Sequence, residues 1–271
     1  MTEIVTLPGG NRWRVGETEF QYSFDEHSTV DRFLIRKPPD LVDLYVELCE
    51  TYRHGTIVEL GIASGGSTAL MSLLAEPSLL VSCELDPSPV GALTEFIHRH
   101  GLSDSVRPFY GVDQSDRALL SRILDAEIGA RPIDLVIDDA SHLHDESRAS
   151  LEVLLPRVRP GGLLIIEDWA ADYVFAKRVV AVMSDQSSRE FPEQERRLTA
   201  AIIEQDRLGP TTPLPRLGIE LMQVAAQASD VVAELTINRH WIAVRRGPAE
   251  LDHAGFRLVD HYQDYWGWTP S

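Results

Sequence analysis

Four side chains that could bind a metal ion or accept a proton follow two short apolar runs of the sequence. Asp139 and His142 come after the first run, and Glu167 and Asp168 come directly after the second. Both runs are typical of buried parallel strands, and neighbouring parallel strands end at the same edge of a sheet. We therefore predict that Asp139, Glu167 and Asp168 hold Mg²⁺ or a similar divalent cation through carboxylate oxygens. His142 lies three positions after Asp139, and we predict that these two residues form the catalytic pair, with His142 as general base.

A purely structural role for the same acids stays open. In that interpretation Asp168 caps a helix that begins near Ala170, and Asp138 or Asp139 braces a loop. Three carboxylates without a cation would repel each other, which favours the metal site.

A glycine-rich turn, ELGIASGGST, occupies residues 59–68 after the first strand-like run. Glycines let the backbone approach a ligand closely, and the next helix offers free N–H groups to it. The glycine spacing lacks the G-x-G-x-x-G pattern that accommodates a dinucleotide, and an acid beside the turn suits a cationic methionine moiety instead. The alternative is a tight turn without a ligand. The predicted cofactor-binding residues of this turn are Glu59, Gly61, Ala63, Gly65, Ser67 and Thr68.

An acid at the end of the second apolar run suits a ribose. Glu84 follows Gly61 by about the 20 positions at which such an acid binds a ribose diol. Asp113 and Gln114 follow the third run, where a loop would face the adenine edge. Asp138 completes the predicted cofactor-binding set.

Alternating strand and helix signals place these residues in an α/β fold. Short apolar runs predict strands, and amphipathic segments between them predict helices. This alternation predicts a doubly wound, Rossmann-like sheet that is mostly parallel, and two runs around Asn238-Arg239 add a terminal antiparallel hairpin strand. The predicted strands are 56–60, 79–83, 106–110, 133–137 and 162–166, and the predicted helices are 66–76, 89–100, 115–127 and 143–157.

We expect residues 1–271 to form one domain with several added segments. Residues 1–37 show no regular period and predict an N-terminal arm. Helices are expected near 192–207 and 216–228. The segments are the arm at 1–37, the cofactor-binding core at 38–183, a helical insertion or lid at 184–228, the hairpin at 229–246 and an aromatic, acidic tail at 247–271.

Composition narrows the classes of partner. The chain has 271 residues and a formal net charge of −17, which repels nucleic-acid phosphates and anionic lipid heads. We therefore expect no nucleic-acid and no membrane partner. No apolar stretch approaches the length of a membrane span, and no signal peptide pattern begins the chain, so a cytoplasmic location is expected. A core of this size needs no disulfide between Cys49 and Cys83, and the aromatic tail predicts a homo-oligomer.

The motifs ELGIASGGST, CELDP, DDASH and LPRVRPGGLLIIEDW together resemble the class I S-adenosylmethionine-dependent methyltransferases. Within that fold they are most similar to the metal-dependent O-methyltransferases that act on sugars of macrolide and enediyne natural products. The resemblance covers about residues 40–246. It implies that Asp139, Glu167 and Asp168 hold the metal and that His142 is the base.

The same resemblance implies the cofactor contacts. Gly61, Gly65 and Ser67 would surround the methionine part of S-adenosylmethionine, and Glu84 would bind its ribose. Ala63 departs from the pattern, since the wider superfamily often has a glycine there.

The reaction expected from these residues is methylation of a sugar hydroxyl on a glycosylated natural product, as in antibiotic biosynthesis. An alkyl hydroxyl is a poor acid, so a divalent cation bound by vicinal hydroxyls would lower its pKa while His142 accepts the proton. We expect Trp13, Phe20, Tyr22 and the insertion to contact the aglycone. The alternatives are a catechol or phenolic O-methyltransferase, a non-catalytic S-adenosylmethionine-binding protein, and a nicotinamide-dependent oxidoreductase, which the glycine spacing disfavours.

Overall fold

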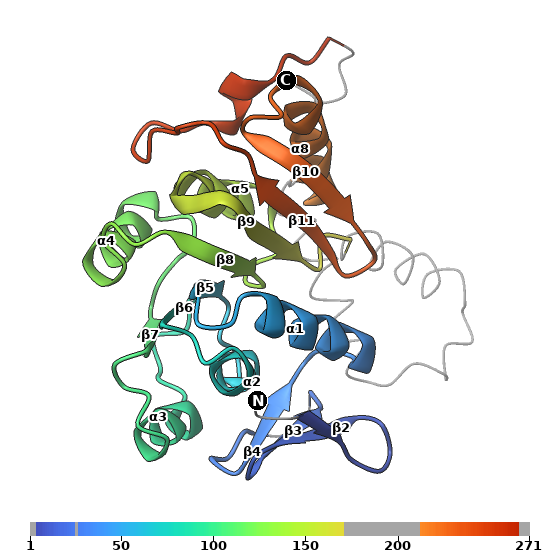
Figure 1. Cartoon of the computed structure of the whole chain (residues 1–271), viewed down its shortest axis with the longest axis vertical. Helices are drawn as coiled ribbons and strands as arrows, with labels where there is room; N and C mark the ends of the chain where they lie inside the picture. Colours follow the sequence, from blue (N-terminus) through green and yellow to red (C-terminus); the bar gives the residue numbers. More distant parts are fainter. Residues whose placement is uncertain (1–3, 25–26, 171–211, 266–271) are drawn as a thin grey trace, which may run out of the picture.

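The computed structural model describes residues 4–24, 27–170 and 212–265, and its central feature is a seven-stranded sheet (Figure 1). The strand order is β10-β11-β9-β8-β5-β6-β7. Neighbours from β7 to β9 run parallel, and only β11 runs against its neighbours β9 and β10. The predicted doubly wound sheet with a terminal antiparallel strand is confirmed. The strands are β5 (Thr56–Leu60), β6 (Leu79–Glu84), β7 (Val106–Tyr110), β8 (Ile133–Asp138), β9 (Val158–Glu167), β10 (Val232–Ile237) and β11 (Trp241–Arg246).

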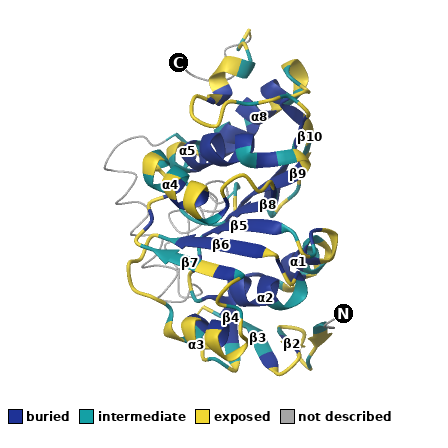
Figure 2. Cartoon of the chain, turned by 60° about the vertical axis from the view of Figure 1, so that its left-hand side comes forward, coloured by how far each residue is buried: buried dark blue, intermediate teal, exposed yellow. Residues whose placement is uncertain are grey.

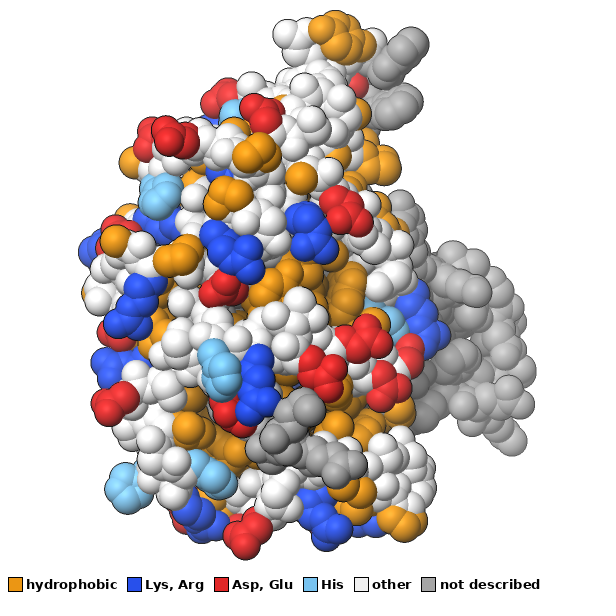
Figure 3. Space-filling view, viewed as in Figure 1, with side chains coloured by type: hydrophobic (Ala, Val, Ile, Leu, Met, Phe, Trp, Pro, Cys, Tyr) orange, Lys and Arg blue, Asp and Glu red, His pale blue; other side chains and the backbone are white. Residues whose placement is uncertain are grey.

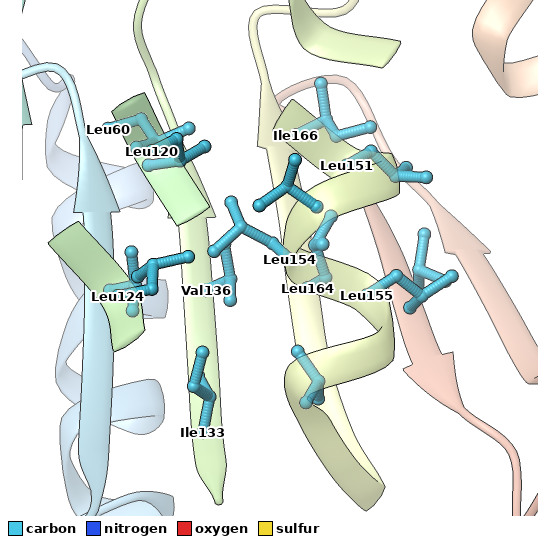
Figure 4. Packing of buried hydrophobic residues seen from close by; sticks show 14 of the residues in the cluster. Leu60, Leu120, Leu124, Ile133, Val136, Leu151, Leu154, Leu155, Leu164 and Ile166 are labelled. Atoms are coloured by element: carbon cyan, nitrogen blue, oxygen red, sulfur yellow. The ribbon is translucent and has the colours of Figure 1, made fainter. Parts of the chain in front are cut away.

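Helices cover both faces of the sheet, because each central strand is apolar on both sides and must be buried twice. One core cluster joins the sheet to α4, α5 and α8 through Leu120, Leu151 and Leu221. Figure 4 shows Leu120 and Leu151 packed with residues of the sheet such as Val136 and Leu164. The other joins it to α1, α2 and α3. Figure 2 shows the buried strands lying between these two layers. The helices are α1 (Pro39–Thr51), α2 (Gly66–Leu74), α3 (Gly91–Arg99), α4 (Arg117–Glu127), α5 (His144–Leu154) and α8 (Pro215–Gln227), with short 3₁₀ helices η1 (Leu155–Arg157) and η2 (Leu258–His261).

The expected N-terminal arm is instead a small sheet of four strands, in the order β1-β2-β3-β4. Its inward side chains, among them Trp13, Phe20 and Phe33, are buried and belong to the core shared with α1, α2 and α3. The ring of Phe33 packs edge-on against Phe96 of α3, with centroids 5.3 Å apart. The strands are β1 (Ile4–Thr6), β2 (Arg12–Val15), β3 (Thr18–Tyr22) and β4 (Arg32–Ile35), and their three to five residues are too few to show a clear period.

The segments after β9 are only partly described. The helix expected near 192–207 lies outside the described residues, whereas the one expected near 216–228 is α8. Part of the tail packs on the chain's own core, because Phe256 and Leu258 are buried there. The Leu258 N–H donates to Glu152 Oε1 at 2.9 Å.

Charged side chains of both signs are interspersed on the face of the molecule drawn in Figure 3, and acidic ones gather over α1. On that helix Asp43, Glu47 and Glu50 are exposed, opposite the buried Leu41 and Tyr45. Among the described residues, none of the helices is both long and apolar enough to cross a membrane.

Candidate functional site

The predicted site residues gather at the edge of the sheet where β5, β8 and β9 end. The Asp139 N–H donates to Leu60 O at 2.9 Å, and the Gly61 N–H donates to Cys83 O at 2.8 Å. Gly61 has φ +97°, and a Cβ there would lie 2.2 Å from the Asp139 carbonyl oxygen. Only glycine permits this approach, so the glycine-rich loop and the first acid of the predicted metal site are in direct contact.

A cavity of about 550 Å³ opens beside the glycine-rich loop, and we name it the cofactor cavity. Gly61, Ala63, Glu84, Asp113 and Gln114, which the sequence analysis assigned to the cofactor, line it. These residues come from the ends of β5, β6 and β7, so the three loops after these strands form one wall.

Glu84 holds the glycine-rich loop in place. Its Oε2 accepts hydrogen bonds from the Ile62 N–H at 3.0 Å and the Ala63 N–H at 2.7 Å, and its Oε1 accepts one from the Asp86 N–H at 3.1 Å. Since a carboxylate has about four acceptor positions, one stays available to a ligand hydroxyl.

Four other residues that the sequence analysis assigned to the cofactor line neither this cavity nor the one described next: Glu59, Gly65, Thr68 and Asp138. Glu59 is buried beneath the loop, where its carboxylate accepts hydrogen bonds from the hydroxyls of Ser67, Thr68 and Ser82. Burial raises the pKa of Glu59. Its role in this structure is to brace the loop from below.

Asp138 also lies behind the cofactor cavity rather than in it. Its carboxylate accepts hydrogen bonds from Gln114 Nε2 at 3.1 Å and Ser150 Oγ at 2.9 Å, and burial raises its pKa to about 6. Gln114 Oε1 in turn accepts a hydrogen bond from the Ser141 N–H at 3.0 Å. Asp138 therefore positions Gln114 and, through it, the loop that carries His142.

A second cavity, of about 650 Å³, contains the predicted catalytic groups, and we name it the acceptor cavity. Asp139, His142 and Asp168 line it, and one potential ligand atom of each lies within 4.8 Å of the others. His142 and Asp168 have φ values of +56° and +49°, a backbone conformation uncommon outside glycine and frequent at functional sites. Partial burial and the nearby Asp139 carboxylate raise the pKa of Asp168.

Glu167, the third predicted metal ligand, is bound by side chains that the sequence analysis did not select. Its Oε2 accepts a hydrogen bond from Lys37 Nζ at 2.8 Å, and its Oε1 accepts one from the Tyr45 hydroxyl. The same Lys37 ammonium lies 2.7 Å from Asp139 Oδ2. Glu167 also lines the acceptor cavity but is only 1% exposed.

The donor set fits a small divalent cation. Asp139 and Asp168 offer carboxylate oxygens, the ligands that Mg²⁺ prefers, and His142 adds an imidazole nitrogen that softer metals accept. Two carboxylates at this separation repel each other unless a cation lies between them.

The two cavities share a wall. Gly61, Ala63, Ser64, Asp139 and Ala140 line both, and so does Arg36 of the segment after β4. The two cavities therefore adjoin each other at these residues.

The aromatic residues expected to contact the aglycone divide into two groups. Trp13 and Phe20 are buried in the core and are not available to a ligand, which corrects the expectation. Tyr22 lines the acceptor cavity, as does Phe24, whose ring lies 5.5 Å from that of Tyr22. The Arg36 guanidinium lies over the Phe24 ring at 5.9 Å.

Sequence reasoning missed Lys37 and His240, which line the acceptor cavity, and Tyr45, which donates a hydrogen bond to Glu167. His240 lines the acceptor cavity, and its Nε2 lies 2.6 Å from Asp40 Oδ2. One weak signal was present, since Lys37 is one of only two lysines among 25 basic residues.

Comparisons with known proteins agree with the fold. Residues 58–169 match a family model described as a methyltransferase domain. The demethylmacrocin O-methyltransferase of Streptomyces fradiae is 48% identical over 62 residues, which are 22% of this chain and 14% of that protein. The mycinamicin VI 2''-O-methyltransferase of Micromonospora griseorubida is 50% identical over 60 residues, again 22% of this chain and 14% of that protein.

Solved structures extend the likeness over most of the chain. The MycE methyltransferase of the mycinamycin pathway, solved in complex with Mg, S-adenosylhomocysteine and mycinamycin VI, has a TM-score of 0.50 at 21% identity. The match covers 83% of this chain and 51% of the MycE chain, so the chain spans about half the length of that protein. The Podospora anserina methyltransferase PaMTH1 has a TM-score of 0.52 at 14% identity, over 78% of this chain and 79% of that one. The strand order and these matches show that the chain has the fold of the class I methyltransferases, and its residues 58–169 match the methyltransferase domain model.

Proposed function

We propose that this protein is an S-adenosylmethionine- and Mg²⁺-dependent O-methyltransferase that methylates a sugar hydroxyl on a glycosylated natural product. The observation that carries the proposal is the shared wall, with the Asp139, His142 and Asp168 cluster on the acceptor side of it. Because the two cavities adjoin there, a methyl donor bound in the cofactor cavity and a hydroxyl bound in the acceptor cavity would be in contact. In-line displacement requires such a contact.

The relatives support the acceptor class. Their names describe methylation of demethylmacrocin, of mycinamicin VI at a 2''-oxygen, and of a rhamnosyl tetracenomycin at a 2'-oxygen. We extend that class, a sugar on a natural product, to this chain.

In the cofactor cavity we assign the ribose to Glu84 and the adenine side to Asp113 and Gln114. The carboxylate of Glu84 faces the cavity with one acceptor position free for a ribose hydroxyl. Glu84 also fixes the backbone of Ala63, so the residue that binds the ribose would also position the loop beside the sulfonium.

In the acceptor cavity Asp139 and Asp168 would hold the metal, and His142 would accept the proton. When bound, S-adenosylmethionine supplies the methyl group as a sulfonium, and Mg²⁺ lowers the pKa of the acceptor hydroxyl and orients it. His142 would accept the proton of that hydroxyl while its oxygen takes the methyl group from the sulfonium. Asp139, 4.0 Å from His142 Nε2, stabilises the resulting imidazolium.

Tyr22 and Phe24 provide an aromatic surface for the acceptor. Both line the acceptor cavity, and Phe24 is 59% exposed. Aromatic faces pack well against the apolar face of a sugar ring or of an aglycone. The N-terminal sheet would thus contribute to acceptor recognition.

The test is a calorimetric titration of the full chain with S-adenosylmethionine and, separately, with Mg²⁺. We expect both to bind, and we expect Asp139→Ala to lose the metal heat while cofactor binding remains. Asp104→Ala, which removes an exposed acid outside both cavities, is the matched control. Absence of cofactor binding to the wild-type chain would overturn the proposal.

Two further expectations from the sequence stay proposals, a homo-oligomer and a cytoplasmic location. Exposed apolar side chains such as Met222, Val259 and Tyr265 support an oligomer. Light scattering of the purified chain would measure the mass, and a monomeric mass would contradict it.

A further inference from the structure

The charges that line the cofactor cavity are nearly all of one sign. Among the described residues of its lining, Arg36 is the single basic one, and every other charged side chain is a carboxylate. A cavity with this excess of carboxylates favours a cationic ligand and repels an anionic group. An anionic group on a ligand bound there would therefore find one cationic side chain, the guanidinium of Arg36. The carboxylates belong to Glu84, Asp86, Asp113, Asp139 and Glu146.

The guanidinium of Arg36 is not paired with an acid of the chain. Its side chain is exposed, and no carboxylate of the described residues forms an ion pair with it. It lies instead over the ring of Phe24, 5.9 Å from the ring centre. A cation–π contact of this kind orients a guanidinium but leaves its N–H donors free. The donors of Arg36 are therefore available to a ligand.

The N-terminal sheet places Arg36 beside the glycine-rich loop. Arg36 directly follows β4, and a Cβ on Gly66 at the start of α2 would lie 3.1 Å from the Cα of Ile35. The backbone before Arg36 is thus packed tightly against the helix that follows the loop. Arg36 also lines both cavities, so it forms part of the wall that they share.

The methionine moiety of S-adenosylmethionine carries the one anionic group of that molecule, its α-carboxylate. The sulfonium and the ammonium are both cationic, which suits the carboxylate-rich lining. With the ribose at Glu84 and the sulfonium at the shared wall, the methionine moiety would extend along that wall, of which Arg36 is part. A guanidinium can bind a carboxylate through two parallel N–H···O hydrogen bonds.

We infer that Arg36 binds the α-carboxylate of S-adenosylmethionine. The inference rests on the proposed function, since it adds a residue to the same cofactor site. The residue comes from the segment after β4, so the N-terminal sheet would contribute to the cofactor cavity as well as to the acceptor cavity. Phe24 would then have two roles, because its ring both lines the acceptor cavity and contacts the guanidinium.

The test compares two ligands that differ only in the carboxylate: S-adenosylhomocysteine and its decarboxylated analogue. Calorimetry without Mg²⁺ and without acceptor measures both dissociation constants for the full chain. We expect the wild type to bind S-adenosylhomocysteine about 10- to 100-fold tighter, the range expected for hydrogen bonds between charged groups.

Arg36→Met removes the guanidinium and keeps a long side chain. We expect this variant to bind S-adenosylhomocysteine about 10- to 100-fold more weakly, whereas its affinity for the decarboxylated analogue changes about fivefold or less. Arg36→Lys should keep part of the preference, because an ammonium retains the charge without the paired donors. Arg14→Met, which removes an exposed arginine of β2 outside both cavities, is the matched control and should bind both ligands as the wild type does.

Three outcomes would overturn the inference: a wild type that binds the two ligands equally well, an Arg36→Met variant with unchanged affinity for S-adenosylhomocysteine, and equal weakening of both ligands in that variant. The melting temperature of each variant reports whether it is folded, and the exposed position of Arg36 leaves the core intact. Failure of the proposed function is distinct, because the wild type would then bind neither ligand.

Discussion

At the scale of single residues, His142 has two possible partners, a proton and a metal ion. Its imidazole lies among the atoms that could share one ion with Asp139 and Asp168. Mg²⁺ prefers oxygen ligands and leaves the imidazole free, whereas softer ions bind it. Under the proposed function, the identity of the bound metal would thus decide whether the imidazole of His142 is free to act as the base.

Replacement of His142 by alanine tests its role as base. We expect kcat to fall ~10²- to 10⁴-fold with an alkyl hydroxyl acceptor, because base catalysis typically contributes that much. S-adenosylmethionine affinity should change little, since His142 lines only the acceptor cavity. Steady-state rates and a cofactor titration measure both quantities.

His98→Ala is the control, since it removes an exposed histidine of α3. A His142→Ala enzyme with wild-type kcat on a sugar acceptor would refute the assignment. We expect a smaller loss of kcat with a phenolic acceptor, because a phenol is a stronger acid than an alkyl hydroxyl.

At the scale of elements, the N-terminal sheet reaches the site through a close contact between β4 and α2. A Cβ on Gly66 would lie 2.1 Å from the carbonyl oxygen of Leu34, a backbone atom of β4. Arg36 and Lys37 follow directly after this contact. The distance between β4 and α2 therefore determines where the Lys37 ammonium lies.

Gly66→Ala should force β4 away from α2. We expect a loss of about 1–3 kcal/mol in the free energy of unfolding, the usual cost of overpacking. Urea unfolding measures it, and Gly91→Ala is the matched control, because nothing lies within 4 Å of a Cβ there. Equal stability of the two variants would show that the contact between β4 and α2 does not limit the size of the side chain at position 66.

The sequence predicted the sheet and its acid-bearing edge because these depend on local pattern and on topology. Continuous apolar runs identify strands buried on both faces, and the rule that parallel strands end at one edge brought Asp139 and Asp168 together. The N-terminal sheet was missed because its strands are too short to show a period. Lys37 was missed because its partners Asp139 and Glu167 lie 102 and 130 positions further along the chain.

At the scale of the whole molecule, a buried polar group joins α5 to α8 on the side of the sheet opposite the N-terminal strands. His144 Nε2 lies 3.2 Å from Glu220 Oε1, and its Nδ1 lies 2.7 Å from Asp145 Oδ1. Both His144 and Glu220 are buried. The C-terminal part of the fold thus depends on a charged contact with the core.

Stability should depend on pH through His144. Burial alone would lower the pKa of His144, but Glu220 and Asp145 raise it above its ordinary value. A group whose pKa is raised in the folded state stabilises the fold fully below its unfolded-state pKa, which is about 6.5 for histidine. This stabilisation is lost as the pH rises through the folded-state pKa.

We therefore expect the urea midpoint to fall as the pH rises above about 6.5 in the wild type, and to fall less in His144→Gln. His98→Gln serves again as the exposed control. An identical pH dependence in the wild type and His144→Gln would show that another group is responsible.

The wall between the two cavities has a consequence for the use of this protein as a catalyst. Apart from Arg36 and Asp139, the residues common to both cavities are glycine, alanine and serine: Gly61, Ala63, Ser64 and Ala140. No bulky apolar side chain of this shared set closes the passage at the point where the transferred group would cross. Under the proposed function, sulfonium donors with an allyl or propargyl group in place of methyl would meet no bulky apolar side chain of this set, and the chain would be a starting point for attaching larger alkyl groups to glycosides.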